Sequence, residues 1–406
     1  MTKKSLFGLM AWLILSSFTQ ANQPAPFSNL PTNGQVQLFA IQGSNTIGAK
    51  LAPELVISYM KAKGATDVEI RNLGQSNEKV IIGTLNQGRT RVLVPISAHG
   101  SGTGFKGLKS GTADIAAASR PIKDKEANML AQMADMRSSA SEHVVGIDGL
   151  AIVVHPANPM STLSVSELAG IFSGKITNWS QLGGRPGNIR VYARDENSGT
   201  WDTFKSMVLS GEELTSTATR YESNDELSDS VSKDSAGIGF VGLSSVRAAK
   251  LLSISDGPAK SMKPNKLTVA TEDYALSRRL FMYTDDNPSN QYVTEFMNFV
   301  QANEGQRVVA ETGFISQELK AVTPESYNEY PQEFQDFTER AKRLTINFRF
   351  HEGSARLDNK ALRDVERLVG YLKEAGDDNS QVLLIGFGDK KKTERRSELL
   401  SKLRAM

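Results

Sequence analysis

An arginine stands close to a Ser-Gly-Thr tripeptide near the middle of this sequence, in the run Tyr192-Ala-Arg-Asp-Glu-Asn-Ser-Gly-Thr-Trp201. Apolar residues at spacings of three and four follow from Trp201, which predicts a helix with Ser198 at its N-cap. A helix N-terminus offers unpaired N–H groups and the positive end of the helix dipole. With Gly199, two hydroxyls and the Arg194 guanidinium beside it, this stretch could bind an oxyanion. An ordinary capped helix with a surface arginine nearby is the alternative.

Two more Gly/Ser/Thr turns follow predicted strands in the first third of the chain. The predicted strand 36–41 leads into Gly43-Ser-Asn-Thr46. Likewise, the predicted strand 92–96 leads into Gly100-Ser-Gly-Thr-Gly104, and a later strand of small residues ends in Ser119-Arg120. Ligands gather at the carboxyl ends of strands in open α/β sheets. We therefore expect a common cleft to be lined by Ser44, Ser101, Arg120 and Ser198.

The same turns allow two other interpretations. The run Gly102-Thr-Gly-Phe-Lys-Gly107 has the GxGxxG spacing of a dinucleotide site, but the predicted helix is short and contains a glycine, so an anion turn is favoured. Ser101 or Ser198 could be the nucleophile of a hydrolase, which needs a base within hydrogen-bond reach. Of the four histidines only His99 adjoins one of these turns, so a non-catalytic receptor is favoured.

The composition is that of an ordinary globular protein. Lys and Arg number 47 against 45 Asp and Glu, so the net charge gives no argument for a nucleic-acid partner. There is no cysteine, which excludes disulfides, thiolate metal sites and a cysteine nucleophile. The histidines show no tight metal-ligand spacing, and we expect neither a metal nor a cofactor.

The first 21 residues have the pattern of a cleavable export signal. Two lysines precede an apolar run from Leu6 to Leu15, and small residues end the segment at Ala21. The run is too short to span a bilayer comfortably. We therefore expect the protein to be exported.

Strands and helices alternate from residue 36 to about residue 318, which predicts α/β lobes with largely parallel sheets. Residues 144–155 are almost continuously apolar, as is typical of a strand buried on both faces. The pattern further predicts a polar helix at 121–141, a helix at 246–252, a strand at 267–270 and an amphipathic helix at 291–302.

The C-terminal part differs in composition. Residues 319–343 are rich in Pro, Glu, Tyr and Gln and predict a linker. Beyond it, we expect strands at 344–350 and 381–387, an amphipathic helix at 358–373 and a last helix at 394–404.

The main body resembles the phosphate-binding proteins of ABC importers, in the two-lobed (type II) periplasmic binding protein superfamily. Besides the three turns and the strand before Ser119-Arg120, the resemblance rests on residues 171–184, 237–240 and 306–314. It implies that turn hydroxyls, backbone N–H groups and an arginine enclose a dehydrated phosphate between the lobes. It assigns phosphate binding to Ser44, Thr46, Ser101, Arg120, Arg194, Ser198, Gly199 and Thr200.

One position departs from that family. Well-known members carry Asp where Arg120 stands, and that Asp accepts the proton of hydrogen phosphate and repels sulfate. Arg120 strengthens anion binding but removes this discrimination. Asp114 and Asp148 are the candidates for a replacement acceptor.

The tail resembles part of the peptidoglycan-binding domain of outer membrane protein A (OmpA). The matching pieces are Asn347-Phe-Arg-Phe350 and residues 383–389 and 400–405, and the loop 390–396 lacks the usual Gly turn. In that family an Asp and an Arg bind the diaminopimelate of the peptide stem. The resemblance assigns peptidoglycan binding to Asp389 and Arg404.

The resemblances imply a non-enzymatic periplasmic receptor that captures phosphate for the membrane subunits of an ABC importer, with a tail that could hold it at peptidoglycan. The alternative is a cell-wall-associated oxyanion sensor or adaptor that is not coupled to an importer. The expected parts are a signal peptide (1–21), a lead-in (22–35), a phosphate-binding-protein-like domain (36–318; first lobe 36–147 and 275–318, second lobe 148–274), a linker (319–343) and a partial OmpA-like domain (344–406).

Overall fold

The computed structural model describes residues 26–74, 77–196, 198–323, 332–351, 354–375, 381–386, 401 and 403–404. The predicted export signal lies outside the described residues. Among those that are described, no helix combines the length and the apolarity that a membrane span requires.

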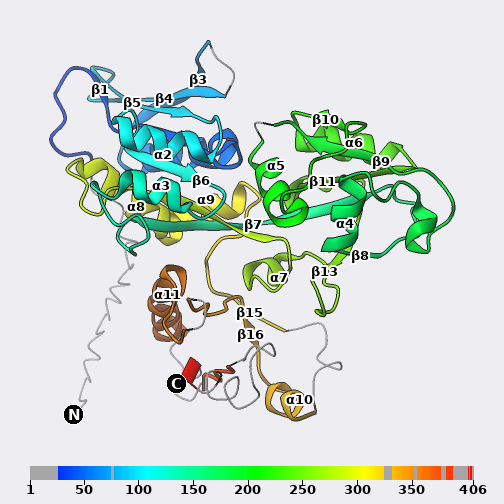
Figure 1. Ribbon diagram of the computed structural model, residues 1–406. Coiled ribbons are helices and arrows are strands. Elements are labelled where there is room, and N and C mark those ends of the chain that lie inside the picture. The colour runs from blue at the N-terminus through cyan, green and yellow to red at the C-terminus, as the bar shows by residue number, and fades with distance from the viewer. Residues whose placement is uncertain are drawn as a thin grey trace, which may run out of the picture.

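Two α/β lobes share one 12-stranded sheet (Figure 1). The strands of the first lobe are β1 (Gly34–Gln37), β2 (Ile41–Gly43), β3 (Thr66–Asn72), β4 (Glu78–Leu85), β5 (Thr90–Ser97) and β6 (Ile115–Ala118). Those of the second lobe are β9 (Arg190–Arg194), β10 (Thr219–Tyr221), β11 (Gly237–Gly242) and β12 (Lys250–Leu251). The strands that cross between the lobes are β7 (Glu142–Val154) and β14 (Ser277–Tyr283).

The pairing makes the centre of each lobe parallel and the crossing antiparallel. The strand order is β10-β9-β11-β7-β14-β6-β2-β5-β4-β3, with β1 beside β5 and β12 beside β7. Residues 142–149 of β7 pair with β14, and residues 150–154 pair with β11. All of β7 beyond Glu142 is buried, which confirms the predicted apolar strand.

Helices cover both faces of the first lobe's sheet because its strand residues alternate between the faces. On one face, Ile115 and Ala117 join a core with α1 and α8, whereas Ala116 and Ala118 pack with α2 and α3 on the other. The helices of this lobe are α1 (Ala52–Ala62), α2 (Ser101–Ser110), α3 (Asp124–Leu130), α8 (Gln291–Gln301) and α9 (Asn303–Glu311), with η1 (Ile47–Leu51) leading into α1. The second lobe has α4 (Val165–Phe172), η2 (Trp179–Leu182), α5 (Gly199–Phe204), η3 (Lys205–Leu209), α6 (Asn224–Lys233), η4 (Leu243–Ser245) and α7 (Lys266–Ala270), with a small sheet of β8 (Thr162–Ser164) and β13 (Ser253–Ser255).

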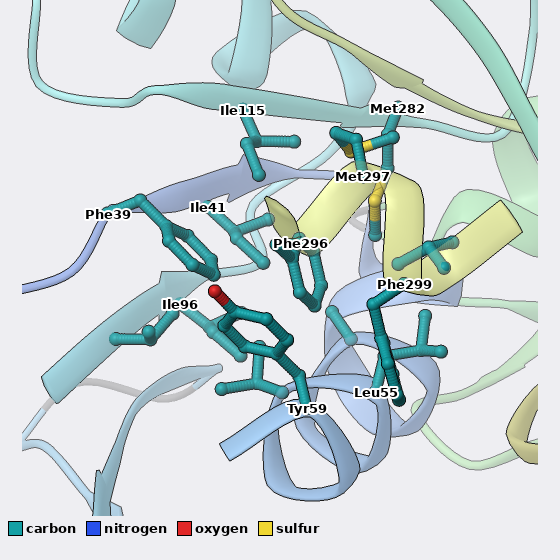
Figure 2. Packing of buried hydrophobic residues seen from close by; sticks show 14 of the residues in the cluster. Phe39, Ile41, Leu55, Tyr59, Ile96, Ile115, Met282, Phe296, Met297 and Phe299 are labelled. Carbon is teal, nitrogen blue, oxygen red and sulfur yellow. The ribbon is translucent and has the colours of Figure 1, made fainter. Parts of the chain in front are cut away.

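Aromatic side chains fill the two cores. In the first lobe the ring of Phe296, from the amphipathic helix that was predicted, lies 4.9 Å from Phe39 and 5.4 Å from Tyr59 (Figure 2). In the second lobe, Phe204 stacks on Phe240 with ring centroids 4.0 Å apart. Burying each such side chain stabilises the fold by about 1.5–3 kcal/mol. Because each lobe has its own core, each can move as a unit.

Four predicted elements of the lobes differ in the structure. The predicted strand 36–41 is split into β1 and β2, and residues 38–40 belong to neither. Residues 267–270 belong to helix α7 because Asn265 and Thr268 form a capping box at its start, which overrides the strand-like apolar run. Residues 246–249 form a turn and β12 follows, because its backbone pairs with β7. The predicted polar helix 121–141 is helical only over α3.

The tail lies below the crossing strands in Figure 1 and folds less regularly than its pattern predicts. It contains β15 (Ala321–Val322), α10 (Gln332–Thr338), β16 (Arg343–Leu344) and α11 (Asn359–Ala375). β16 pairs with β15, so the predicted strand 344–350 is wrong beyond Leu344, and residues 381–386, the described part of the other predicted strand, form no strand. The amphipathic helix is confirmed, but its polar side faces the body, with Lys360 and Asp364 buried and 2.6 Å apart.

His143, on β7, lies where α11 meets the body. Arg363 donates to its Nδ1 at 3.1 Å, and because guanidinium is only a donor, the proton of the neutral ring sits on Nε2, 3.3 Å from Thr284 Oγ1. Burial and the nearby charge of Arg363 lower the pKa of His143 to about 4. The folded protein therefore holds this ring neutral at a pH where the unfolded chain would protonate it.

We expect the free energy of unfolding to fall as the pH drops from about 6.5 to about 4, because the unfolded state binds a proton that the folded state excludes. The His143 contribution amounts to about 3 kcal/mol at full extent, from a pKa of about 4 against 6.5. Urea unfolding at pH 7.5 and pH 5 should show a loss of about 2 kcal/mol from this residue, because pH 5 still lies above the folded pKa of about 4. His143→Gln is the control. Equal losses in wild type and variant would contradict the assignment.

Candidate anion-binding site

Three helix N-termini meet between the lobes. The first helix starts directly after Ser44, at the end of β2, and Ser101 is the first residue of α2. In the second lobe, Ser198 caps α5 and accepts from the N–H groups of Thr200 at 3.2 Å and Trp201 at 3.4 Å. These ends direct backbone N–H groups and the positive ends of helix dipoles toward one place.

The lobes are closed on each other at Gly199. A Cβ built on this residue would lie 2.4 Å from Thr46 Oγ1, 3.1 Å from Ser44 Oγ and 3.2 Å from Ser119 Oγ, all in the first lobe. No side chain fits in that space, so glycine is required here by close approach rather than by an unusual φ. The structure thus brings Ser44, Thr46 and Gly199 together, as the resemblance implies.

Serine hydroxyls in the first lobe form a small buried group. Ser44 Oγ is buried without a hydrogen-bond partner among the described residues. Ser101 Oγ accepts from the N–H of Ser119 at 3.2 Å and lies 3.5 Å from its hydroxyl. A buried hydroxyl without a partner costs free energy, which a ligand oxygen at this place would recover.

Arg194 is buried at the end of β9. Its Nε donates to the carbonyl of Tyr221 at 3.1 Å, and Nη2 donates to the carbonyl of Glu222 at 2.5 Å. Burial lowers the pKa of Arg194; the charge of Asp195 opposes this effect and the charge of Arg278 adds to it. A bound anion near both guanidinium groups would offset their burial and their mutual repulsion.

Arg278, on β14, is a residue that the sequence reasoning missed. Its Nε and Nη2 donate to Asp148 Oδ2 at 3.0 and 2.6 Å, and both side chains are almost fully buried. Nη1 donates to the carbonyl of Gly199 at 2.7 Å and to Thr203 Oγ1, while Nη2 reaches Thr46 Oγ1 at 3.4 Å. Arg278 therefore ties the start of α5 to the crossing strands and to the opposite lobe. The sequence places Arg278 directly after Ser277, at the start of the strand that returns to the first lobe, and this position could have pointed to it.

Arg120 is held differently from what its motif predicts. Its guanidinium forms a bidentate pair with Glu126 at 2.7 and 2.8 Å and stacks over Phe105, 5.8 Å from the ring centroid. Burial raises the pKa of Glu126, but the hydrogen bond and charge of Arg120 lower it overall. Most of the Arg120 charge is thus balanced inside its own lobe. Ser119, its neighbour, contributes the hydroxyl near Gly199 instead.

The two candidate acceptors also have structural partners. Asp148 accepts from Arg278. Asp114 Oδ2 accepts from the N–H of Ala40 at 2.8 Å and so connects the chain before β2 to the start of β6. Of the two candidate peptidoglycan residues, Asp389 lies outside the described residues. Arg404 donates to the carbonyl of Ser354 at 3.2 and 3.3 Å and lies over the Phe350 ring. In the described part of the chain, no group of three or more His, Asp or Glu could hold a metal ion.

The fold and the cleft define a two-lobed α/β binding protein. Residues 58–304 match the PBP superfamily domain, and the chain belongs to that superfamily. It is 33% identical over 245 residues to Protein SphX of Synechococcus elongatus, covering 57% of this chain and 71% of SphX. It is 28% identical over 289 residues to the Phosphate-binding protein PstS of Staphylococcus aureus, covering 68% of this chain and 86% of that protein.

A solved structure shows the same fold. An ABC-type phosphate transport receptor from Vibrio cholerae superimposes with a TM-score of 0.54 at 26% identity, covering 68% of this chain and 99% of that one. Two of these three relatives are named for phosphate binding or phosphate transport. The superfamily match ends at residue 304, so it does not include the tail.

Removing the Asp148 carboxylate is expected to destabilise the protein strongly. Asp148→Asn would leave the Arg278 charge buried without its counter-ion, which typically costs about 3–5 kcal/mol. Urea unfolding measures this loss. As a control, Glu69→Gln breaks an exposed pair with Arg71 and should cost less than about 1 kcal/mol.

A double variant, Asp148→Leu with Arg278→Met, should recover much of the stability because no unpaired charge then remains. An Asp148→Asn variant as stable as wild type would show that the pair does not stabilise the crossing strands.

Proposed function

We propose that this protein captures inorganic phosphate between its two lobes and delivers it to the membrane subunits of an ABC importer. The observation that carries this proposal is the convergence on Gly199 of hydroxyls from one lobe and a helix N-terminus from the other. Relatives that are named for phosphate binding or phosphate transport support it. Together with the predicted export signal, this function places the protein in the periplasm.

The donor set suits a dehydrated phosphate. Backbone N–H groups at the starts of α2 and α5 and the buried Arg194 guanidinium supply positive potential and donors. The hydroxyls of Ser44, Thr46 and Ser119 can donate or accept, so one of them can accept the proton of hydrogen phosphate. This supplies the acceptor that the family's Asp provides, at whose position Arg120 stands. The residues that bind phosphate in this proposal are those assigned by the resemblance except Arg120, whose charge is balanced by Glu126, with Ser119 added.

No chemical step is required of the site. Phosphate enters when the lobes separate about β7 and β14, and closure then excludes water and strengthens each charge-assisted hydrogen bond. Release at the importer needs only the reverse motion. The protein is therefore a receptor and not an enzyme in this proposal.

Calorimetric titration of the full chain with phosphate tests the proposal. We expect tight binding of phosphate and at least about tenfold weaker binding by Gly199→Ala, because the added Cβ would meet Thr46 Oγ1 at 2.4 Å and hold the lobes apart. Gly102→Ala is the matched control, since its Cβ meets only Glu126 Oε1 at 3.7 Å. Binding of sulfate in place of phosphate, or unchanged binding by Gly199→Ala, would refute the proposal.

We further propose that the tail holds the receptor at peptidoglycan, on the strength of its resemblance to the OmpA-like domain. Retention of the full chain on purified peptidoglycan should fall at least severalfold in Arg404→Ala, because the stem carboxylate would lose its guanidinium partner. Arg356→Ala, in the same tail, is the control. If the chain passes through unretained, the tether is excluded while phosphate capture is unaffected.

A further inference from the structure

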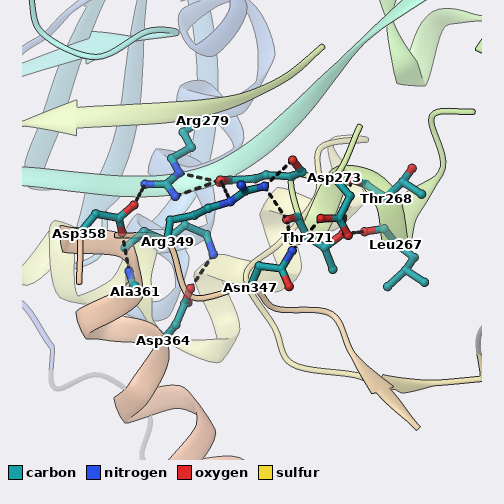
Figure 3. Close-up of polar contacts among 12 residues, drawn as sticks. Leu267, Thr268, Thr271, Asp273, Arg279, Asn347, Arg349, Asp358, Ala361 and Asp364 are labelled. Carbon is teal, nitrogen blue, oxygen red and sulfur yellow. Dashed lines mark hydrogen bonds and ion pairs between the residues drawn. The ribbon is translucent and has the colours of Figure 1, made fainter. Parts of the chain in front are cut away.

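Residues 343–351 and 354–367, which we call the strap, lie across the strands that join the two lobes. In Figure 1 this segment lies below β7, whereas α5 lies above it. Figure 3 shows its contacts with the loop after α7 and with β14. The strap therefore contacts parts of the protein that must move when the lobes open.

One end of the strap is fixed to the second lobe. Asn347 Nδ2 donates to the carbonyl of Thr271 and to Asp273 Oδ1, both at 2.8 Å (Figure 3). Arg349 Nη2 donates to the carbonyl of Glu272 at 2.6 Å. The loop 271–273 is held between Val269 and Tyr274, which belong to the second lobe's core. These contacts therefore follow the second lobe.

The middle of the strap is fixed at the crossing itself. Arg279, on β14, pairs with Glu272 Oε1 at 2.5 Å and with Asp358 Oδ2 at 2.8 Å (Figure 3). Asp358 also caps α11, since its Oδ1 accepts from the N–H of Ala361 at 2.8 Å. All three members of this network are largely shielded from solvent, so salt screens it less than an exposed pair.

The other end of the strap is fixed to the first lobe. Asn359 Nδ2 donates to the carbonyl of Arg137 at 2.8 Å. Arg363 donates to the carbonyl of Ser139 at 3.2 Å as well as to His143. Arg367 Nη2 donates to Gln301 Oε1, on α8, at 2.7 Å. These partners belong to the lobe that carries Thr46.

Both anchors are intact in the arrangement in which Gly199 meets Thr46. We propose that the strap stabilises the closed arrangement of the lobes and thereby raises the affinity of the cleft for its anion. A receptor that spends more time closed binds its ligand more tightly, because the apparent dissociation constant rises as the binding-competent fraction falls. By linkage, anion binding stabilises the contacts of the strap by the same free energy by which the strap favours anion binding. The consequence for affinity rests on the proposed function, but the effect on closure does not.

Lobe closure can be measured directly because the chain has no cysteine of its own. Spin labels at Lys109→Cys on α2 and Lys233→Cys on α6, both exposed and outside the cleft, report the distance between the lobes. In this background, Asn347→Ala with Arg349→Ala removes the hydrogen bonds of the second-lobe anchor and leaves only the longer pair of Arg343 with Asp273, at 3.6 Å. Arg356→Ala is the control, an exposed strap residue whose side chain is not part of either anchor.

Without ligand, we expect the anchor variant to shift the label distances toward longer values and the control to match wild type. With saturating phosphate, all three should reach the same short distance. The anchor variant should also bind phosphate about fivefold more weakly by calorimetry, with faster dissociation. Equal ligand-free distances in wild type and anchor variant would refute the proposal that the strap stabilises closure. If the distances differ but wild type binds no phosphate, the role of the strap in closure is supported and phosphate is refuted as the ligand.

Discussion

A buried ion pair between Arg278 and Asp148 is the interaction on which the rest of the structure depends. It joins the two strands that cross between the lobes, and the same guanidinium donates to Gly199 in one lobe and Thr46 in the other. A buried charge is tolerated only when it is paired and its remaining donors are used. The pair therefore restricts the orientation of α5 relative to the crossing strands, and with it the position of the Ser198 cap.

This arrangement would let the cleft bind an anion, as the proposed function requires, although the whole protein is almost neutral. Asp148 balances Arg278, whereas Arg194 has backbone carbonyls as its close partners and Asp195 only at 3.8 Å. Helix N-termini add donors at the same place, as does the hydroxyl of Ser44, which has no hydrogen-bond partner in the described part of the chain. A single phosphate would satisfy the excess of donors, so selectivity comes from local geometry and not from net charge.

The tail reverses the usual orientation of an amphipathic helix. α11 turns Lys360, Arg363 and Asp364 toward the body and leaves Leu362, Val365, Val369 and Leu372 exposed. The body's surface there offers carbonyls, carboxylates and His143, so polar side chains are its natural partners. A polar interface of this kind depends on the exact relative position of its partners, which is what makes the strap sensitive to lobe closure.

The sequence by itself determined the α/β class, the long apolar crossing strand and the three turns of the cleft, because these follow from periodicity and from residues that favour helix N-termini. It also predicted that Arg194 and Gly199 belong to the site, because they stand in one contiguous motif. It missed Arg278, whose partner Asp148 lies 130 residues away in the chain. It also did not reveal the pair between Arg120 and Glu126, because spacing in a sequence does not show which way a side chain turns. Likewise, the apolar pattern of 344–350 and 381–387 predicted strands, but a strand also needs a neighbouring edge, and only tertiary structure decides whether one is present.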